Sequence, residues 1–251
     1  MLFKLGIHIG NAQPRVCTFQ FSQVRAWATI YGVRPTQIFN CIWDFNLSMK
    51  WGDAWDESII IEQLDPLNEC IYLRAPLPSG VTLRDFVQFR GCQFDKADDP
   101  DFCLILFRNA QHPKYPLEYT QQRGYIRGET LGIIGYSVRA IPVPPDTDPN
   151  LFKGRAPSAC RVSITTCFDL KGLIPRWLVN WVAGKAPITW AVNLQKAVDN
   201  GLGLAACQSP LSAGAPPIPS QLILRPLAGS NIMPSAGADE SDSALVRRRN
   251  T

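Results

Sequence analysis

The side chains best suited to metal, acid–base or nucleophilic chemistry lie far apart in this sequence. His8 and His112 have no acidic or cysteine neighbour at the spacing of a zinc site. The eight cysteines include no C-x-x-C pair, so we expect reduced, buried thiols rather than a metal or redox centre. The acidic stretch 95–101 lacks the glycine and glutamate of a calcium loop and is predicted to form a hairpin turn. A nucleophilic Cys–His pair brought together by the fold stays open at this stage.

One stretch resembles a cofactor-binding motif. GLGLAA (201–206) matches a dinucleotide-binding pattern, but it follows a predicted helix, whereas such a loop must follow a strand and open a helix. The sequence has no phosphate-binding G-x-x-x-x-G-K-[ST] loop and no G-x-S-x-G nucleophile elbow. We therefore expect a protein that is not an enzyme and that uses no cofactor and no metal.

The composition is that of a globular protein with a substantial core. Of the 251 residues, 46% are hydrophobic, and the net charge is +4, with Lys and Arg scattered rather than clustered. This distribution does not favour nucleic acid as a partner. The sequence shows neither a signal peptide nor 18 consecutive apolar residues, so we expect a cytoplasmic protein.

The amino-acid composition of the chain changes near residue 203. Residues 1–203 read as one domain. Residues 204–251 are rich in Pro, Ser, Ala and Gly and contain no aromatic residue, which predicts a disordered tail.

Short runs rich in Val, Ile, Phe, Tyr and Thr, bounded by turn residues, predict β-strands in the middle of the domain. The turn ADDPD (97–101) should join FVQFR (86–90) to CLILFR (103–108) as a hairpin. Because the second run is apolar as far as Phe107, we expect both of its faces to be buried.

Two helical segments accompany these strands. The first covers residues 35–46 and has Pro35 in its first turn. The second extends from Pro175 to about Gly201 and must kink or restart at Pro187. Its inward face is predicted to hold Leu178, Trp181, Val182, Trp190, Ala191, Leu194, Ala197 and Val198, with Gln195, Lys196, Asp199 and Asn200 on the polar side.

A long C-terminal helix laid against a mostly antiparallel sheet predicts an α+β helix-grip fold. Such a fold can leave an apolar cavity between sheet and helix. The candidate polar groups in that cavity are Gln88, Arg90, Ser163 and Thr165.

Three stretches, in this order, resemble the landmark motifs of START domains, a family of lipid-binding domains. They are LRDFVQFR (83–90), QRGYIRGE (122–129) and FDLKGLIPRWLVN (168–180). WDESIIIEQLDPLNECIYL (55–73) also resembles the family's path from its second helix into the sheet. The resemblance covers about residues 3–203, and the ordered set is more specific than any one motif.

The resemblance implies a hydrophobic tunnel that holds one lipid, a phospholipid or a sterol, under a C-terminal helix that acts as a lid. It implies a monomer, peripheral to membranes, that transfers lipid without chemical turnover. The stretch 74–83 corresponds to a gate loop beside the lid. The family's N-terminal helix is expected to be missing, because the chain starts near the first strand. Two alternatives remain: a lipid sensor that acts through a protein partner, and a helix-grip enzyme with a polar dyad in its cavity.

Individual positions carry the resemblance unevenly. Arg90 resembles the arginine that sterol-binding members pair with an acid inside the tunnel. The acid's position falls near Ile71 here, and Glu69, on the same strand face, is the candidate partner after a small register shift; an exposed arginine is the alternative. At the choline-cage positions of phosphatidylcholine binders the chain has Ile71 and Phe86, which argues against a copy of that site.

Trp190 and Leu194 match positions that face the ligand from the lid, although ordinary core packing is the alternative for both. The residues predicted to contact lipid are Trp55, Ile71, Leu73, Phe86, Gln88, Arg90, Ile105, Phe107, Thr165, Trp181, Trp190 and Leu194.

Overall fold

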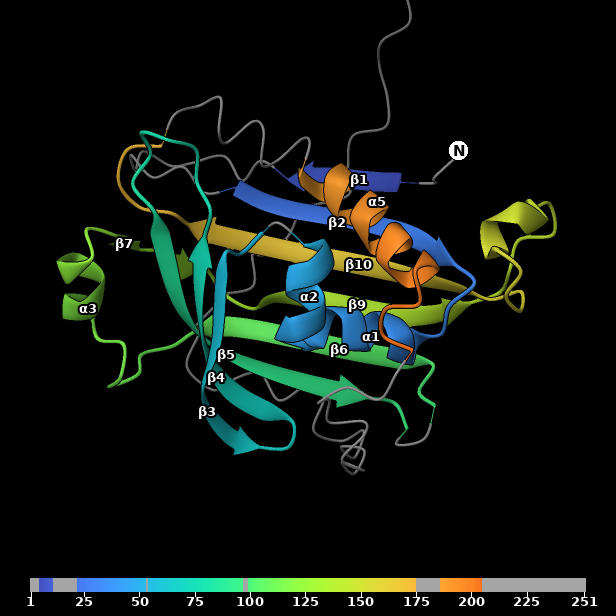
Figure 1. Cartoon of the computed structure of the whole chain (residues 1–251), viewed down its shortest axis with the longest axis horizontal. Helices are drawn as coiled ribbons and strands as arrows, with labels where there is room; N and C mark the ends of the chain where they lie inside the picture. The colour runs from blue at the N-terminus through green and yellow to red at the C-terminus, as the bar shows by residue number, and fades with distance from the viewer. Residues whose placement is uncertain (1–4, 11–21, 53, 97–98, 175–185, 205–251) are drawn as a thin grey trace, which may run out of the picture. The chain divides into compact units, whose positions relative to one another are not determined.

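The computed structural model describes residues 5–10, 22–52, 54–96, 99–174 and 186–204, which all belong to one compact unit spanning residues 1–218. Ten strands form a single sheet (Figure 1). Eight of them follow the order β1-β2-β10-β9-β6-β5-β4-β3, and every neighbouring pair along this path is antiparallel. These are β1 (Leu5–Gly10), β2 (Ser22–Tyr31), β3 (Glu57–Asp65), β4 (Asn68–Ala75), β5 (Arg84–Phe94), β6 (Phe102–Asn109), β9 (Ile134–Ile141) and β10 (Ala159–Asp169).

Two short strands join the sheet off this path. β7 (Ile126–Arg127) pairs in parallel with the start of β5, and β8 (Glu129–Thr130) pairs with the end of β10. Together they bring the segment 126–130 beside the same end of the sheet.

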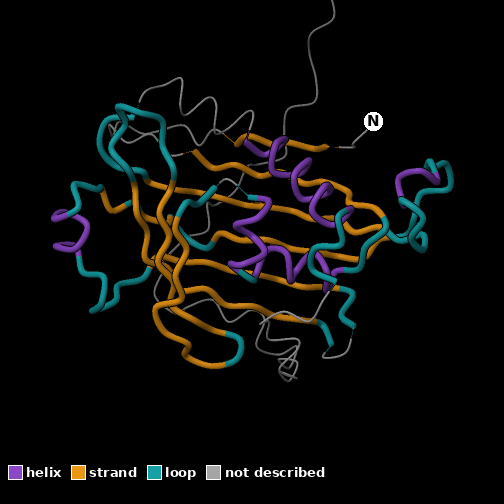
Figure 2. Tube along the Cα trace, in the orientation of Figure 1, coloured by secondary structure: helices purple, strands orange, loops and turns teal. Residues whose placement is uncertain are grey.

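The helices are distributed unequally over the sheet. α1 (Pro35–Trp43), α2 (Phe45–Trp51) and α5 (Ala186–Asp199) lie on one face, here called the concave face, and α1 contacts β6, β9 and α5 (Figure 2). α3 (Leu117–Gln122) lies at one end of the sheet and the 3-10 turn η1 (Pro149–Phe152) at the other (Figure 1). An antiparallel sheet with its C-terminal helix on one face confirms the predicted α+β helix-grip fold.

The helical segment predicted at 35–46 is two helices. Pro35 occupies the first turn of α1, where its missing N–H costs no hydrogen bond. Asp44 then leaves helical geometry, and its carboxylate accepts a hydrogen bond from the backbone N–H of Asn46 at 2.8 Å, which caps the start of α2. A side chain that prefers the N-cap position therefore divides one apolar run into two helices.

The strands present alternate residues to the two faces, and the register identifies the concave set. Along β5, Phe86, Gln88, Arg90 and Cys92 share the concave face, whereas Asp85 and Val87 lie on the opposite, convex face. Both faces of β5 are buried over most of its length.

The prediction that both faces of CLILFR are buried was wrong. In β6, Cys103 and Ile105 on the concave face are fully buried, but Leu104 is only half-buried and Leu106 is 37% exposed on the convex face. The hairpin with β5 is confirmed, since Phe94 lies opposite Cys103. A continuous apolar run thus does not require cover on both sides.

α5 contains the second half of the helix predicted from Pro175. Ala191, Leu194, Ala197 and Val198 are buried as predicted. Gln195 was expected on the polar side, yet it is buried: its Oε1 accepts from the backbone N–H of Tyr31 at 3.1 Å, and its Nε2 donates to Asp199. Residues 175–185 and the predicted tail from 205 onward lie outside the described residues.

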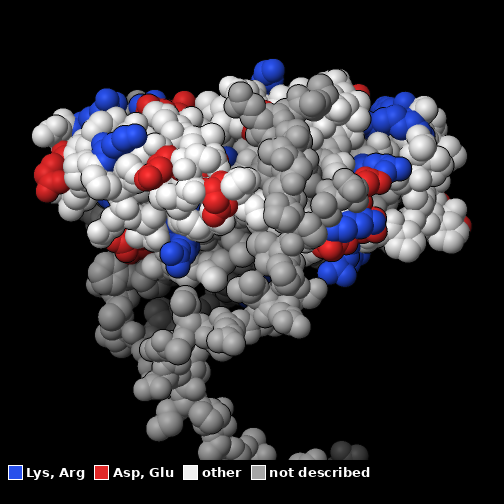
Figure 3. Space-filling model, turned by 90° about the horizontal axis from the view of Figure 1, so that it is seen from below, with Lys and Arg blue, Asp and Glu red and all other residues white. Residues whose placement is uncertain are grey.

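The described surface mixes charges of both signs. Figure 3 shows one face of the molecule, on which Lys and Arg lie next to Asp and Glu over the residues that the structure describes. None of the helices in the described ranges is long and apolar enough to cross a membrane.

Candidate functional site

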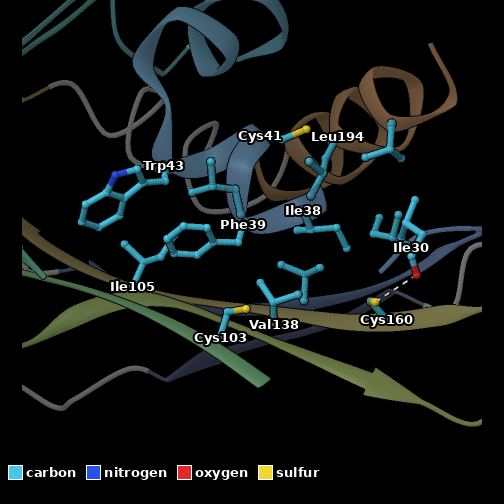
Figure 4. Close-up of a cluster of buried hydrophobic side chains, with 14 of the residues drawn as sticks. Ile30, Ile38, Phe39, Cys41, Trp43, Cys103, Ile105, Val138, Cys160 and Leu194 are labelled. Carbon is cyan, nitrogen blue, oxygen red and sulfur yellow. Dashed lines mark hydrogen bonds between the residues drawn. The ribbon is translucent and has the colours of Figure 1, made fainter. Parts of the chain in front are cut away.

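The concave face has a closed half beneath α1 and α5. Side chains from both helices pack there against Cys103, Ile105, Val138 and other inward residues of β6, β9 and β10 (Figure 4). Phe39 of α1 stacks on Trp43 and meets Phe94 edge-on at 4.9 Å. Two predicted lipid contacts, Ile105 and Leu194, are fully buried in this cluster. In the structure both side chains are core residues that pack against other protein side chains.

The other half of the concave face is aromatic and less completely covered. Ile71, Leu73 and Phe86 are buried there, while Trp55 and Phe168 are only half-buried against them. The three rings pack edge-on, with centroids 5.5 Å apart for Trp55–Phe86, 5.3 Å for Phe86–Phe168 and 6.2 Å for Trp55–Phe168. This aromatic cluster brings together four of the predicted lipid contacts: Trp55, Ile71, Leu73 and Phe86.

Gly128 makes room for this cluster. A Cβ atom at this position would lie 2.4 Å from Cε1 of Phe86, and the glycine's own N–H donates to the carbonyl of Asp85 at 2.9 Å. Gly128, the second glycine of the QRGYIRGE motif, therefore lets the chain cross directly over the Phe86 ring.

An aromatic row joins the two halves. Phe107 packs against both clusters and meets Tyr136 edge-on at 6.1 Å. Tyr136 in turn stacks on Trp190 of α5, with ring centroids 5.8 Å apart and planes 25° apart. All three side chains are half-buried. Phe107 and Trp190 were predicted; Tyr136 was missed, although its alternation with Ile134 and Val138 in β9 places it on the same face.

Arg90 is buried and fully engaged by the protein. It lies directly opposite Glu69 on β4, and its Nε donates to Glu69 Oε1 at 2.7 Å, with a second hydrogen bond from Nη2 to the same oxygen. Nη1 donates to the backbone carbonyl of Trp43 at 2.8 Å. The guanidinium also sits 4.1 Å and 4.2 Å from the ring centroids of Trp43 and Phe45.

The pairing of Arg90 with Glu69 is confirmed, and it needs no register shift. Burial lowers the pKa of the Arg90 guanidinium, and the Glu69 carboxylate opposes that effect. Only 1% of the Arg90 side chain is exposed, so the alternative of a surface arginine is wrong. The pair therefore has a structural role: its hydrogen bonds connect β4, β5 and the end of α1 inside the core.

Two of the polar side chains predicted to line the cavity, Gln88 and Thr165, lie on opposite faces of the sheet. Gln88 lies on the concave face and donates to the hydroxyl of Thr130 on β8 at 2.5 Å. Thr165 lies on the convex face instead, because the concave residues of β10 are the even-numbered ones, Val162, Ile164 and Thr166. Thr165 and its neighbour Ser163 therefore do not line the concave face, and Thr166 takes that place.

A second buried arginine fixes the end of β10. Arg84 donates through Nε to the carbonyl of Leu170 at 3.0 Å and through Nη2 to that of Lys171 at 2.9 Å, with a third bond to Thr82. Burial lowers the pKa of this guanidinium. The side chain ties the base of the 76–83 loop to the chain that leads toward residue 175.

Trp181, the remaining predicted contact, lies outside the described residues. Within those residues, the two histidines and the cysteines, aspartates and glutamates form no group of three that could hold a metal ion. Burial raises the pKa of Cys160 to about 12 and raises the pKa values of Cys92 and Cys103 further, which keeps these thiols protonated at neutral pH.

The fold and this apolar concave face define a helix-grip domain. The START domain sequence profile matches residues 13–200. Because this match covers most of the chain, the protein belongs to the START domain family, which confirms the resemblance found in the sequence.

Solved structures of this family share the fold. The structure of human STARD10 gives a TM-score of 0.59 at 18% identity, covering 77% of this chain and 68% of that chain. Human StAR-related lipid transfer protein 5 gives 0.57 at 19% identity, covering 78% of this chain and 88% of that chain. Human StarD13, in its lipid transfer and protein localization domain, gives 0.51 at 15% identity, covering 76% of this chain and 88% of that chain. No curated protein sequence gives a significant match.

Proposed function

We propose that the domain binds one lipid between the concave face and α5 and carries it between membranes. The observation that carries this proposal is the aromatic half of the concave face. There, Trp55, Phe107, Tyr136 and Phe168 remain half-buried on the face where α1 and α5 cover a closed core. Membership of the START family and the structural similarity to human StAR-related lipid transfer protein 5 support it.

The driving force for such a cargo is hydrophobic. Each methylene group that moves from water into an apolar site contributes about 0.8 kcal/mol. An acyl chain or sterol skeleton on rings such as Phe86 and Phe168 therefore binds strongly without a charged partner. We propose that this process is physical transfer, without chemical turnover or cofactor, by a monomer that contacts membranes from the cytoplasm.

The 76–83 loop is the proposed gate. Pro76, Pro78, Ser79 and Gly80 are exposed at its tip, and Leu173 is 97% exposed on the neighbouring turn. Arg84 connects these two segments through its hydrogen bonds to Leu170 and Lys171. A membrane that takes up the apolar tip would thus act on both segments together.

Two adjacent threonines allow a matched test. Thr166→Trp places a large ring on the concave face, whereas Thr165→Trp places the same ring on the convex face of the same strand. Both wild-type side chains are half-buried. The purified full chain is incubated with donor vesicles that carry a fluorescent lipid and with unlabelled acceptor vesicles.

We expect wild type and Thr165→Trp to move lipid between vesicles and Thr166→Trp to lose most of that activity. Native mass spectrometry reports the bound lipid in parallel. Equal transfer by all three proteins would overturn the assigned site. Lipid bound in mass spectra without any movement between vesicles would replace transfer by the sensing alternative.

A further inference from the structure

The helix α5 contains, above the concave face, a buried hydrogen-bond donor that has no acceptor among the described residues. The indole Nε1 of Trp190 is inaccessible to solvent and has no partner among the described residues. Buried polar groups in native proteins are paired in the large majority of cases, because an unpaired donor forfeits the hydrogen bond that it makes with water. This donor therefore points to an acceptor that binds there.

Tyr136 adds a second polar side chain that packs against Trp190. Its ring stacks on Trp190, and its hydroxyl has no hydrogen-bond partner in the described part of the chain. Burial raises the pKa of Tyr136 to about 12, so the hydroxyl is neutral at physiological pH and can donate or accept. Two stacked rings of the concave region thus carry an indole N–H and a neutral phenol, and neither side chain has a charge.

The arginines of the concave face are already occupied. Arg90 is neutralised by Glu69 and also bonds the carbonyl of Trp43, and Arg84 bonds three backbone carbonyls. Recruiting either guanidinium to an anionic headgroup requires breaking buried hydrogen bonds. Moving a charged phosphate into an apolar site supported only by neutral groups is unfavourable.

We propose that Trp190 and Tyr136 hold an oxygen of a neutral lipid, one whose polar groups are only hydroxyl, ketone or ester groups. This inference rests on the proposed lipid binding and adds the class of lipid. The aromatic cluster of Trp55, Phe86 and Phe168 takes the hydrocarbon, and the indole N–H donates to the oxygen. Selectivity then follows from hydrogen bonding rather than from charge.

The test compares probes that differ in their polar end. The full chain is equilibrated with phosphatidylcholine vesicles that contain cholesterol, dioleoylglycerol, dioleoyl phosphatidate or cholestane, which is a sterol skeleton without oxygen. Native mass spectrometry measures which molecule is retained. The variants are Trp190→Phe and Tyr136→Phe, each of which removes one polar group and keeps an aromatic ring. Tyr115→Phe, on the convex face, is the matched control.

We expect the wild type to retain cholesterol or dioleoylglycerol in preference to phosphatidate, phosphatidylcholine and cholestane. Each site variant should weaken retention of the preferred neutral lipid by about 3- to 10-fold, the effect of one lost hydrogen bond, and leave cholestane unchanged. Tyr115→Phe should behave like wild type, and thermal melts check that all variants are folded.

Two results would overturn the inference while leaving lipid binding intact. One is preferential retention of a phospholipid, and the other is an equal loss of cholesterol and cholestane in Trp190→Phe. Retention of none of the lipids by the wild type would instead overturn the proposed function itself.

Discussion

Strand β5 buries a charged side chain on each of its faces, and the two charges are compensated differently. On the concave face, Arg90 meets Glu69, whose side chain is only 2% exposed, so both members of the pair are removed from water. On the convex face, fully buried Asp85 accepts from Arg127 Nε at 2.9 Å and from the Thr120 hydroxyl at 2.8 Å. Arg127 remains 14% exposed.

The difference lies in where the surviving charge can go. If Glu69 is lost, Arg90 stays under α1 and between two aromatic rings, far from water. If Asp85 is lost, Arg127 can turn toward solvent and keep its bond to the carbonyl of Tyr115. A buried ion pair in which one member can reach solvent is therefore expected to lose less stability, when its partner is removed, than a pair in which neither member can.

The largest effect is expected for Glu69→Gln. The change leaves the Arg90 cation buried without a counter-charge and should lower the free energy of unfolding by about 3–5 kcal/mol. Urea unfolding followed by circular dichroism measures this loss. The double variant Glu69→Leu/Arg90→Met removes both charges and should recover most of the stability. A loss below about 1 kcal/mol for Glu69→Gln would contradict this structural role, since an exposed ion pair contributes about that much to stability.

A smaller loss is expected for Asp85→Asn. Asparagine can still accept one hydrogen bond, and Arg127 reaches water, so the loss should be about 1.5–3 kcal/mol, the range for hydrogen bonds to charged groups. The same urea experiment measures it. Should this variant prove as unstable as Glu69→Gln, solvent access to the surviving charge does not explain the contrast between the two faces.

The last prediction concerns a buried neutral thiol, which has no effect of this kind at neutral pH and changes stability only as the pH is raised. The pKa of Cys160 is raised from 9.0 to about 12 in the folded protein. Between these values the unfolded thiol loses its proton while the folded one keeps it. Stability is therefore retained below pH 9 and falls above it, by about 1.4 kcal/mol per pH unit for one thiol.

Cys160→Ala should make the loss of stability between pH 9 and 11 shallower, although it also removes the weak bond to the Val33 carbonyl at all pH values. Half-buried Cys167, whose pKa is raised less, provides the control as Cys167→Ala. Equal slopes for wild type and Cys160→Ala would show that this thiol is not shielded from water in solution.

Strand alternation predicted much of the site from the sequence. Residues two positions apart share a face, which is why Glu69 was identified as the partner of Arg90 and why Ile71, Leu73 and Phe86 gather in one cluster. In β10 the same alternation, from Val162 and Ile164, places Thr166 rather than Thr165 on the concave face, so the sequence already contained the signal for this position.

Other features depend on tertiary contacts that no local pattern encodes. Gln195 is polar and lies among polar neighbours in sequence, yet the open end of β2 supplies partners that make its burial favourable. The exposed side of β6 depends on what covers the convex face, where Tyr115 and Tyr119 pack near Tyr72 of β4 and Val87 of β5 rather than over β6. That the Trp190 indole has no acceptor among the described residues depends on the positions of all those residues, which no local sequence pattern gives.

The order of strands has a consequence for how the protein is made. β2 pairs with β10, so Ala28 can pair only after Val162, 134 residues later in the chain, has been synthesised. At a synthesis rate of roughly 5–20 residues per second, this edge of β2 stays without its partner for about 7–27 s. Such distant pairing also slows folding in general. We expect β2 to be the last long strand protected in pulse-labelled hydrogen exchange, and the nascent chain to rely on chaperones during that interval.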